Sequence, residues 1–227
     1  TSDGGYIIVG GTYSFGVGGD IYLVKTDANG IEQWSQTFGG SGFENAYSVQ
    51  QTADGGYIIT GETNSFGVGG DIYLVKTDLN GVEEWNKTFG GSGYDFSRGS
   101  VKQTTDGGYI ILGTKDFFAN PMNHTGGIYL VKTDPLGNSI WTQTFGTSHW
   151  RGHSVQQTSD GGYIIAGEMK NMIGHFNDPT SVYLVKTDSN GIEQWWKDLG
   201  AGVGYSVQQT SDGGYIIGSE FDPSAIS

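Results

Sequence analysis

The chain has 227 residues, which is long enough to bury a substantial core as one all-β domain. Its 41 glycines and 13 tyrosines beside only four prolines predict many short strands joined by tight turns, and no long stretch has helical apolar spacing. A net charge of −13 argues against a nucleic-acid groove, and the absence of cysteine excludes disulfides and thiolate metal sites.

No apolar run approaches the roughly 18 residues that a membrane-spanning helix needs. The chain starts at Thr1 rather than Met, which we interpret as a processed or trimmed product, with removal of a signal peptide as the preferred explanation. We therefore expect an extracellular or cell-surface protein.

The elements predicted along the chain recur with a fixed period. A D-G-G-Y-I-I segment, which varies only in its flanking residues, begins at Asp3, Asp54, Asp106, Asp160 and Asp212, so successive copies are 51, 52, 54 and 52 residues apart. Y-L-V-K-T-D follows, beginning at Tyr22, Tyr73, Tyr129 and Tyr183. Next comes a tryptophan, at Trp34, Trp85, Trp141 and Trp195. A Ser-Val pair closes each period, beginning at Ser48, Ser100, Ser154 and Ser206. Each period therefore holds four strand-like runs, as one four-stranded propeller blade does.

Two kinds of turn separate these runs. T-x-D-G-G and T-D-x-N-G both place glycine where a hairpin needs positive φ. The aspartates of the second turn invite a calcium interpretation, but an EF-hand loop needs more oxygen ligands and a closing glutamate. We predict instead that they cap the turn through its own backbone, at Asp27, Asp78, Asp134 and Asp188.

GETNSF, DIYLVKTDLNGVEEW and TFGGSG, followed by a Ser-Val strand, resemble the β-propeller repeat of secreted bacterial and archaeal proteins. The resemblance covers nearly the whole chain and implies a small β-propeller with four blades of four antiparallel strands, plus a surplus C-terminal strand. It implies a single domain over 1–227, with repeats at 3–53, 54–105, 106–159 and 160–211 and a partial repeat at 212–227. Repeats three and four depart from the pattern where SFGVGGD becomes FFANPMNHTGG and MIGHFNDPTSV.

The chain carries the same strand near both ends. We expect Tyr205 to Thr210 to complete the first blade and close the ring, so that Tyr215, Ile216 and Ile217 compete with Tyr6, Ile7 and Ile8 for one position. Burying one such set is worth very roughly 5 kcal/mol, which makes the losing copy costly to leave in water. It caps an edge locally, pairs with another molecule by strand exchange, or belongs to a longer array.

The irregular loops of repeats three and four hold all four histidines, and they provide our candidate ligand site. A tryptophan there would stack on a sugar ring while arginine and histidine bind its hydroxyls or a carboxylate. The alternative is that these are ordinary loop residues. The candidates are His124, His149, Trp150, Arg151, His153, His175, Phe176 and Asp178.

We predict no catalytic residue, cofactor or metal site. A glycosidase needs two carboxylates facing each other across a cleft, whereas Glu62, Glu168 and Glu220 recur at one repeat position. Two glycosylation sequons, at Asn86 and Asn123, are weak support for a surface location.

Two functional classes remain open. One is a non-catalytic binding or adhesion module for a carbohydrate or a surface protein. The other is a structural subunit that forms an oligomer or filament by exchanging its duplicated terminal strand.

Overall fold

The computed structural model describes residues 1–16, 18–115, 126–147, 150–170 and 180–221. All regular secondary structure in those ranges is β-strand, and the strands form four antiparallel sheets. Within the same ranges there is no helix long and apolar enough to cross a membrane.

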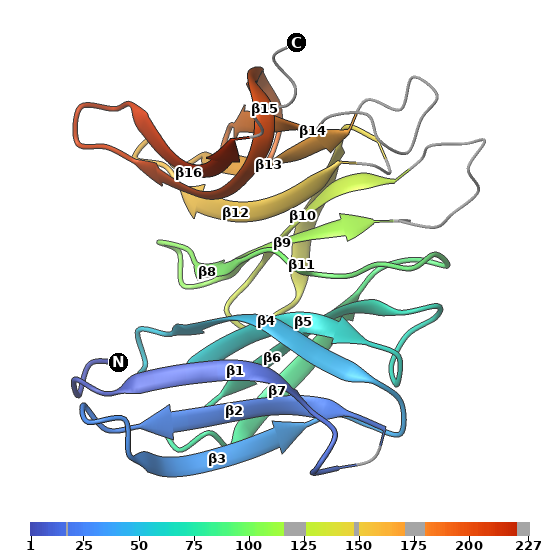
Figure 1. Cartoon of the computed structure of the whole chain (residues 1–227), viewed down its shortest axis with the longest axis vertical. Coiled ribbons are helices and arrows are strands. Elements are labelled where there is room, and N and C mark those ends of the chain that lie inside the picture. Colours follow the sequence, from blue (N-terminus) through green and yellow to red (C-terminus); the bar gives the residue numbers. More distant parts are fainter. Residues whose placement is uncertain (17, 116–125, 148–149, 171–179, 222–227) are drawn as a thin grey trace.

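The sheets follow one another along the chain (Figure 1). The first contains β1 (Tyr6–Thr12), β2 (Asp20–Thr26) and β3 (Glu32–Phe38) in that order. The second contains β4 (Glu44–Gln51), β5 (Tyr57–Thr63), β6 (Asp71–Thr77) and β7 (Glu83–Phe89). The third contains β8 (Val101–Gln103), β9 (Tyr109–Lys115), β10 (Gly127–Thr133) and β11 (Ser139–Phe145). The fourth contains β12 (Arg151–Gln157), β13 (Tyr163–Lys170), β14 (Thr180–Thr187), β15 (Glu193–Gln209) and β16 (Tyr215–Phe221).

The predicted strands and turns are confirmed. Each Ser-Val strand pairs with the following Y-I-I strand, as β4 does with β5, where Val49 lies opposite Ile59. The predicted capping by Asp27 is also present, because its Oδ1 accepts hydrogen bonds from the N–H groups of Asn29 (2.8 Å) and Ile31 (2.9 Å). Asp78, Asp134 and Asp188 accept the equivalent bonds.

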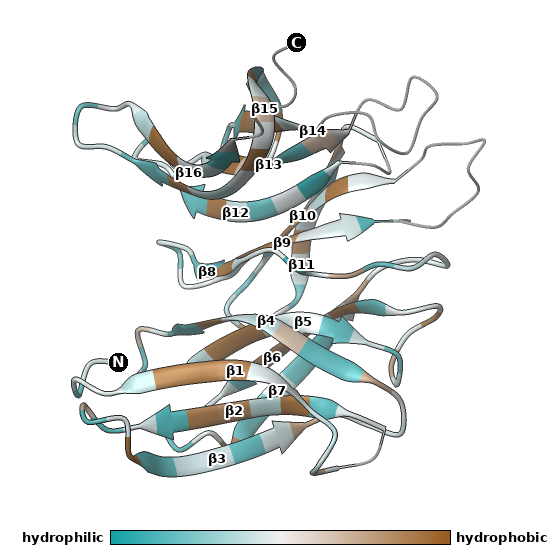
Figure 2. Cartoon of the chain, viewed as in Figure 1, coloured by the Kyte–Doolittle hydropathy of each residue, from teal (hydrophilic) through white to brown (hydrophobic). Residues whose placement is uncertain are grey.

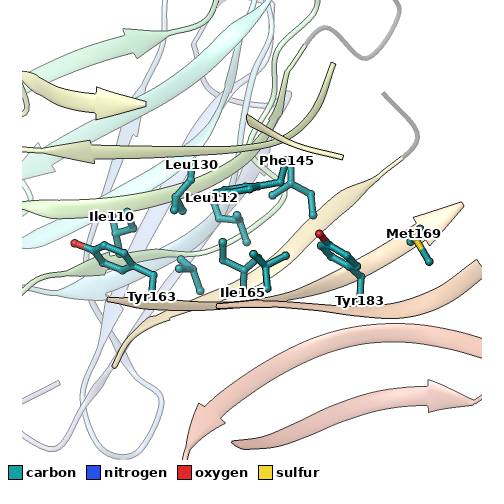
Figure 3. Packing of buried hydrophobic residues seen from close by; sticks show 11 residues of the cluster. Ile110, Leu112, Leu130, Phe145, Tyr163, Ile165, Met169 and Tyr183 are labelled. Atoms are coloured by element: carbon teal, nitrogen blue, oxygen red, sulfur yellow. The ribbon is translucent and has the colours of Figure 1, made fainter. Parts of the chain in front are cut away.

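The sheets stack face to face, and apolar side chains fill the space between them. Y-I-I and Y-L-V are apolar on both faces because each inner sheet is covered on both sides. In the second sheet, Ile58 packs toward the third sheet and Ile59 toward the first. Figure 3 shows the same arrangement between the third and fourth sheets, where Ile110 and Leu130 meet Tyr163 and Ile165.

The repeated tryptophan locks each sheet to the next one. The ring of Trp34 lies 5.8 Å from the ring of Tyr57 in an edge-on arrangement, and a Cβ at Gly81 would come within 2.6 Å of the same indole. Gly81 also has φ of +79°, so turn geometry and the close approach both require glycine there. Equivalent ring pairs join the later sheets at Trp85–Tyr109 and Trp141–Tyr163, and within the fourth sheet Trp195 of β15 makes the same pair with Tyr215 of β16.

The described strands do not close into the expected four-bladed ring. The end of β15 pairs with β16, with Val207 opposite Ile217, and β1 pairs only with β2. The first sheet and the β15–β16 hairpin lie at opposite ends of the long axis (Figure 1). Within the described residues, the four sheets therefore contain three, four, four and five strands rather than four each.

The surplus strand has a local partner, so Tyr215 to Ile217 do not compete with Tyr6 to Ile8. Tyr215 and Ile217 pack on the fourth sheet, because the hairpin that they form continues the stack. Each end of the stack leaves one apolar face uncovered: Tyr6 and Ile8 are 57% and 53% exposed in β1, and Ile216 is 62% exposed in β16. Figure 2 shows the apolar band along β1 at the lower end of the molecule.

Candidate functional site

The S-V-x-Q-T strands, one per repeat, lie next to one another and are joined by their side chains. Ser48 Oγ accepts the N–H of Val101 (3.3 Å), and Ser100 Oγ accepts the N–H of Val155 (2.9 Å). Two residues further on, Gln50 Oε1 accepts the N–H of Gln103 at 2.8 Å. Backbone N–H groups at the edge of each sheet, which would otherwise lack a partner, thus bond to side-chain oxygens of the neighbouring sheet.

A second set of bonds runs in the opposite direction along the stack. Gln103 Oε1 accepts the N–H of Ala53 (2.8 Å), and Gln157 Oε1 accepts the N–H of Thr105 (2.9 Å). The N–H groups of Ser2 and Ser159 donate the same bond to Gln51 Oε1 and Gln209 Oε1. We call the two sets together the glutamine ladder.

A cavity of about 680 Å³ opens along this ladder, and we call it the inner-strand groove. Its described walls come from β4, β8, β12 and β15 together with the adjoining turns. They carry amides, hydroxyls, two valines and one ammonium group. The lining residues are Gln50, Lys102, Gln103, Thr105, Ser154, Val155, Gln156, Gln157, Thr158, Ser159, Ser206, Val207 and Gln208.

The four lysines of the Y-L-V-K-T-D segments have structural partners and do not reach this groove. Lys186 Nζ lies 2.8 Å from Asp160 and also donates to the carbonyl of Thr187, and its side chain is only 4% exposed. Lys25, Lys76 and Lys132 form the equivalent ion pairs with Asp3, Asp54 and Asp106. This repeated pair holds the D-G-G turn against the strand that carries the Y-L-V-K-T-D segment.

The recurring glutamates take different partners in different repeats. Glu62 is buried and accepts hydrogen bonds from the hydroxyls of Tyr47 and Tyr94, both at 2.8 Å. Burial, with the bond to Glu62, raises the pKa of Tyr94 to about 12, so this phenol remains a donor at neutral pH. Glu220 accepts a bond from Tyr205 at 3.0 Å.

Glu168 lies among basic groups instead. Its Oε1 is 3.2 Å from Arg151 Nη1 and 3.8 Å from His153 Nε2. His153 and Arg151 lower the pKa of Glu168, against the opposing effect of burial. Two candidates for ligand recognition, Arg151 and His153, are therefore brought together, but around a carboxylate of their own protein.

The third described candidate, Trp150, is partly buried and packs against the core. Its ring packs edge-on against Tyr183 at 4.3 Å, and it contacts the cluster between the third and fourth sheets. An indole held this way stabilises the sheet interface and is not a free platform for a sugar ring. His124, His149, His175, Phe176 and Asp178 lie outside the described residues.

Of the two sequons, Asn86 lies exposed on β7, where its side chain donates to Glu83 at 2.6 Å, and Asn123 is outside the described residues. In the described part of the chain, no three His, Asp or Glu side chains are grouped so as to hold a metal.

Reasoning from the sequence missed the glutamine ladder and the groove beside it. The signal was available, because a glutamine pair follows Ser-Val at 50–51, 156–157 and 208–209, and Lys-Gln stands there at 102–103. Its meaning depended on knowing that these strands lie next to one another in space.

The fold and the groove define an all-β protein built from stacked, propeller-like antiparallel sheets. No family model and no curated protein matches the chain. Among solved structures, it is similar to a protein of unknown function from Dyadobacter fermentans, with a TM-score of 0.55 and 13% identity over 92% of this chain. The chain spans 66% of that protein's length, and the likeness shows a shared fold alone.

A GH43 endo-arabinanase from Bacillus licheniformis also matches, with a TM-score of 0.45 and 11% identity over 98% of this chain and 95% of the enzyme. A likeness at that level carries no argument about the activity of this chain.

Proposed function

We propose that this protein is a non-catalytic binding module, outside the cell or on its surface, that holds a carbohydrate in the inner-strand groove. The observation that carries the proposal is the groove itself, whose volume of about 680 Å³ lies in the usual range of ligand sites. Its amide and hydroxyl groups both donate and accept hydrogen bonds, as sugar hydroxyls do. These groups can bind and orient a ligand, and none of them titrates near neutral pH.

The proposal places the ligand on the inner strands rather than on the irregular loops. Trp150 is packed against Tyr183, and Arg151 is paired with Glu168, so these residues are occupied within the protein. The repeating four-stranded unit is, in this proposal, a propeller blade. A closed four-bladed ring is not part of it, because β15 pairs with β16.

Blocking the groove tests this function. Thr105 lies on the groove wall, and Ala53 occupies the same position of the preceding repeat outside the groove. Thr105→Trp should weaken binding to any glycan that wild-type protein retains by about tenfold or more, because a bulky indole displaces the ligand. Ala53→Trp should bind as wild type does.

The measurement is retention of the full chain on a panel of neutral and acidic oligosaccharides, followed by titration calorimetry on each hit. Circular dichroism of both variants establishes that the sheets are intact. A wild-type protein that binds no glycan, or a Thr105→Trp variant that binds as well as wild type, contradicts the proposal.

A second candidate function is a structural subunit that assembles end to end with further copies of itself. In the second sheet, the Ile59 face packs on the preceding sheet and the Ile58 face on the following one. Ile8 occupies the repeat position of Ile59, and Ile216 that of Ile58, so the two exposed ends correspond to the two faces that meet between inner sheets, which supports this candidate. Contacts of this kind are heterologous and can extend into filaments.

A further inference from the structure

The glutamine ladder is interrupted at one position, Lys102 in β8. Its counterparts Gln50 and Gln156 each accept a backbone N–H from the next inner strand, with distances of 2.8 Å to Gln103 and to Gln209. A lysine ammonium has three donors and no acceptor. The N–H of Gln157, which occupies the equivalent position in β12, therefore has no such acceptor on Lys102.

The interruption leaves hydrogen-bond donors on both sides of the groove. Lys102 and Gln157 both line it, on adjacent inner strands. Gln156, beside them, uses its Oε1 to bind Gln209, so its free hydrogen-bonding capacity lies mainly in its amide NH₂. An acceptor placed between β8 and β12 would thus replace the glutamine oxygen that the other repeats supply.

Charge at the groove favours an anionic acceptor, although the whole chain is acidic. The described residues that line it include Lys102 and no carboxylate. In the adjoining turns, Asp106 and Asp160 are paired with Lys132 and Lys186 at 2.9 and 2.8 Å. More distant carboxylates are largely screened, because the Debye length is about 8 Å at physiological ionic strength.

We infer that the groove binds an acidic sugar whose carboxylate docks between the Lys102 ammonium and the Gln157 N–H. This inference rests on the proposed function and names the ligand class. One carboxylate oxygen would accept from the ammonium and the other from the backbone, in charge-assisted bonds that are about twice as strong as neutral ones. The sugar hydroxyls would pair with the amides and hydroxyls along the rest of the groove.

A sugar acid fits this lining better than an acidic peptide does. Peptide recognition relies on pockets for side chains, and the described apolar residues on the walls are Val155 and Val207. The other described groups on the walls are polar and suit a hydroxyl-rich ligand.

The test compares an oligogalacturonate with its methyl ester, which keeps the backbone and loses the charge. Wild-type protein, titrated at 0.15 M salt, should bind the acid about tenfold or more tightly than the ester. Lys102→Gln and Lys102→Met should each remove that preference. Lys197→Gln, which makes the same change at an exposed site outside the groove, should preserve it.

Comparing the two Lys102 variants distinguishes an effect on ligand binding from an effect on the stability of the fold. Lys102→Gln restores an acceptor for the Gln157 N–H and should raise the melting temperature, whereas Lys102→Met should not. A purely structural lysine would not produce loss of acid binding together with a gain in thermal stability.

Two outcomes overturn the inference and leave the proposed function standing. They are equal binding of acid and ester, and undiminished acid binding by Lys102→Met. Binding of oligoglutamate in place of the sugar acid overturns the inference and counts against a carbohydrate ligand as well. If neither sugar binds, the inference also falls, and the Thr105→Trp comparison on the wider panel decides the proposed function separately.

Discussion

At the residue scale, one repeat position can have different consequences depending on its partners. The D-G-G aspartates all accept a bond from the threonine two residues earlier and from the second glycine of the turn, as Asp160 does from Thr158 and Gly162. Asp160 also binds the buried Lys186, whereas Asp212 has the threonine and glycine bonds but belongs to a partial repeat with no Y-L-V-K-T-D segment. Comparing Asp160 with Asp212 therefore isolates the contribution of the bond to Lys186 within one molecule.

The bonds from Lys186, Thr158 and Gly162 lower the pKa of Asp160 to about 2, below the roughly 3.9 of an unfolded chain. A folded-state pKa below the unfolded value stabilises the fold above the unfolded pKa, and this stabilisation is lost as the pH falls through the folded pKa. Asp160→Asn should lower the free energy of unfolding at pH 7 by about 1 kcal/mol, a modest value because the carboxylate is mostly in solvent.

Urea denaturation between pH 7 and pH 2 checks this expectation. The difference between wild type and Asp160→Asn should shrink between about pH 4 and pH 2. Asp212→Asn is the control and should have a smaller effect at every pH. Equal effects of the two substitutions would show that the Lys186 pair contributes nothing measurable.

At the element scale, the inner strands are held by side chains as well as by their own sheets. The β8 strand has only three residues and pairs with β9 on one side, and the ladder supplies bonds from β4 on the other. A short strand with few ladder bonds of its own depends on such support, because buried N–H groups without partners are costly.

Gln50→Leu removes the acceptor for the Gln103 N–H and should lower the free energy of unfolding by about 1–2 kcal/mol. Gln208→Leu makes the same change at the same repeat position on β15, beyond which the described part of the chain has no further inner strand, and should be close to neutral. Thermal and urea unfolding of both variants provides the comparison. A Gln208→Leu variant as destabilised as Gln50→Leu would mean that the effect does not come from the ladder.

At the scale of the whole molecule, the stack has an exposed apolar face at each end. The two faces correspond to the two faces that pack together between inner sheets. Interior residues at the same repeat positions, such as Ile59 and Ile58, are fully buried, while Ile8 and Ile216 are more than half exposed. Burying such side chains is worth about 1.5–3 kcal/mol each, which provides a driving force for end-to-end contact.

If the second candidate function holds, the sedimentation coefficient of wild-type protein should rise with concentration. Ile8→Asp or Ile216→Asp should abolish the rise, because either change places a charge in the interface. Leu79→Asp, at an exposed turn residue away from both ends, should leave it intact. A wild-type protein that stays monomeric over the whole range would eliminate the assembly function.

The strands and turns could be predicted because their determinants are local. Asn-Gly and Asp-Gly fix the hairpins, and Y-I-I and Y-L-V, apolar on both faces, indicate sheets covered on both sides. Trp150 could not be placed, because an indole in an irregular segment is equally compatible with a loop platform and with the core contact to Tyr183 that is observed. The groove escaped prediction because it joins residues about 50 positions apart.

The sequence by itself determined the strand-like runs of each repeat and their turn chemistry, since each follows from residues close together in the chain. Only the tertiary structure decided that β15 would pair with β16 and that Lys102 and Gln157, on neighbouring inner strands, would line one groove. Both depend on the position of one sheet relative to the next. That position is set by the packing of tryptophan, tyrosine and isoleucine side chains between the sheets, and neither the repeat length nor the strand pattern contains it.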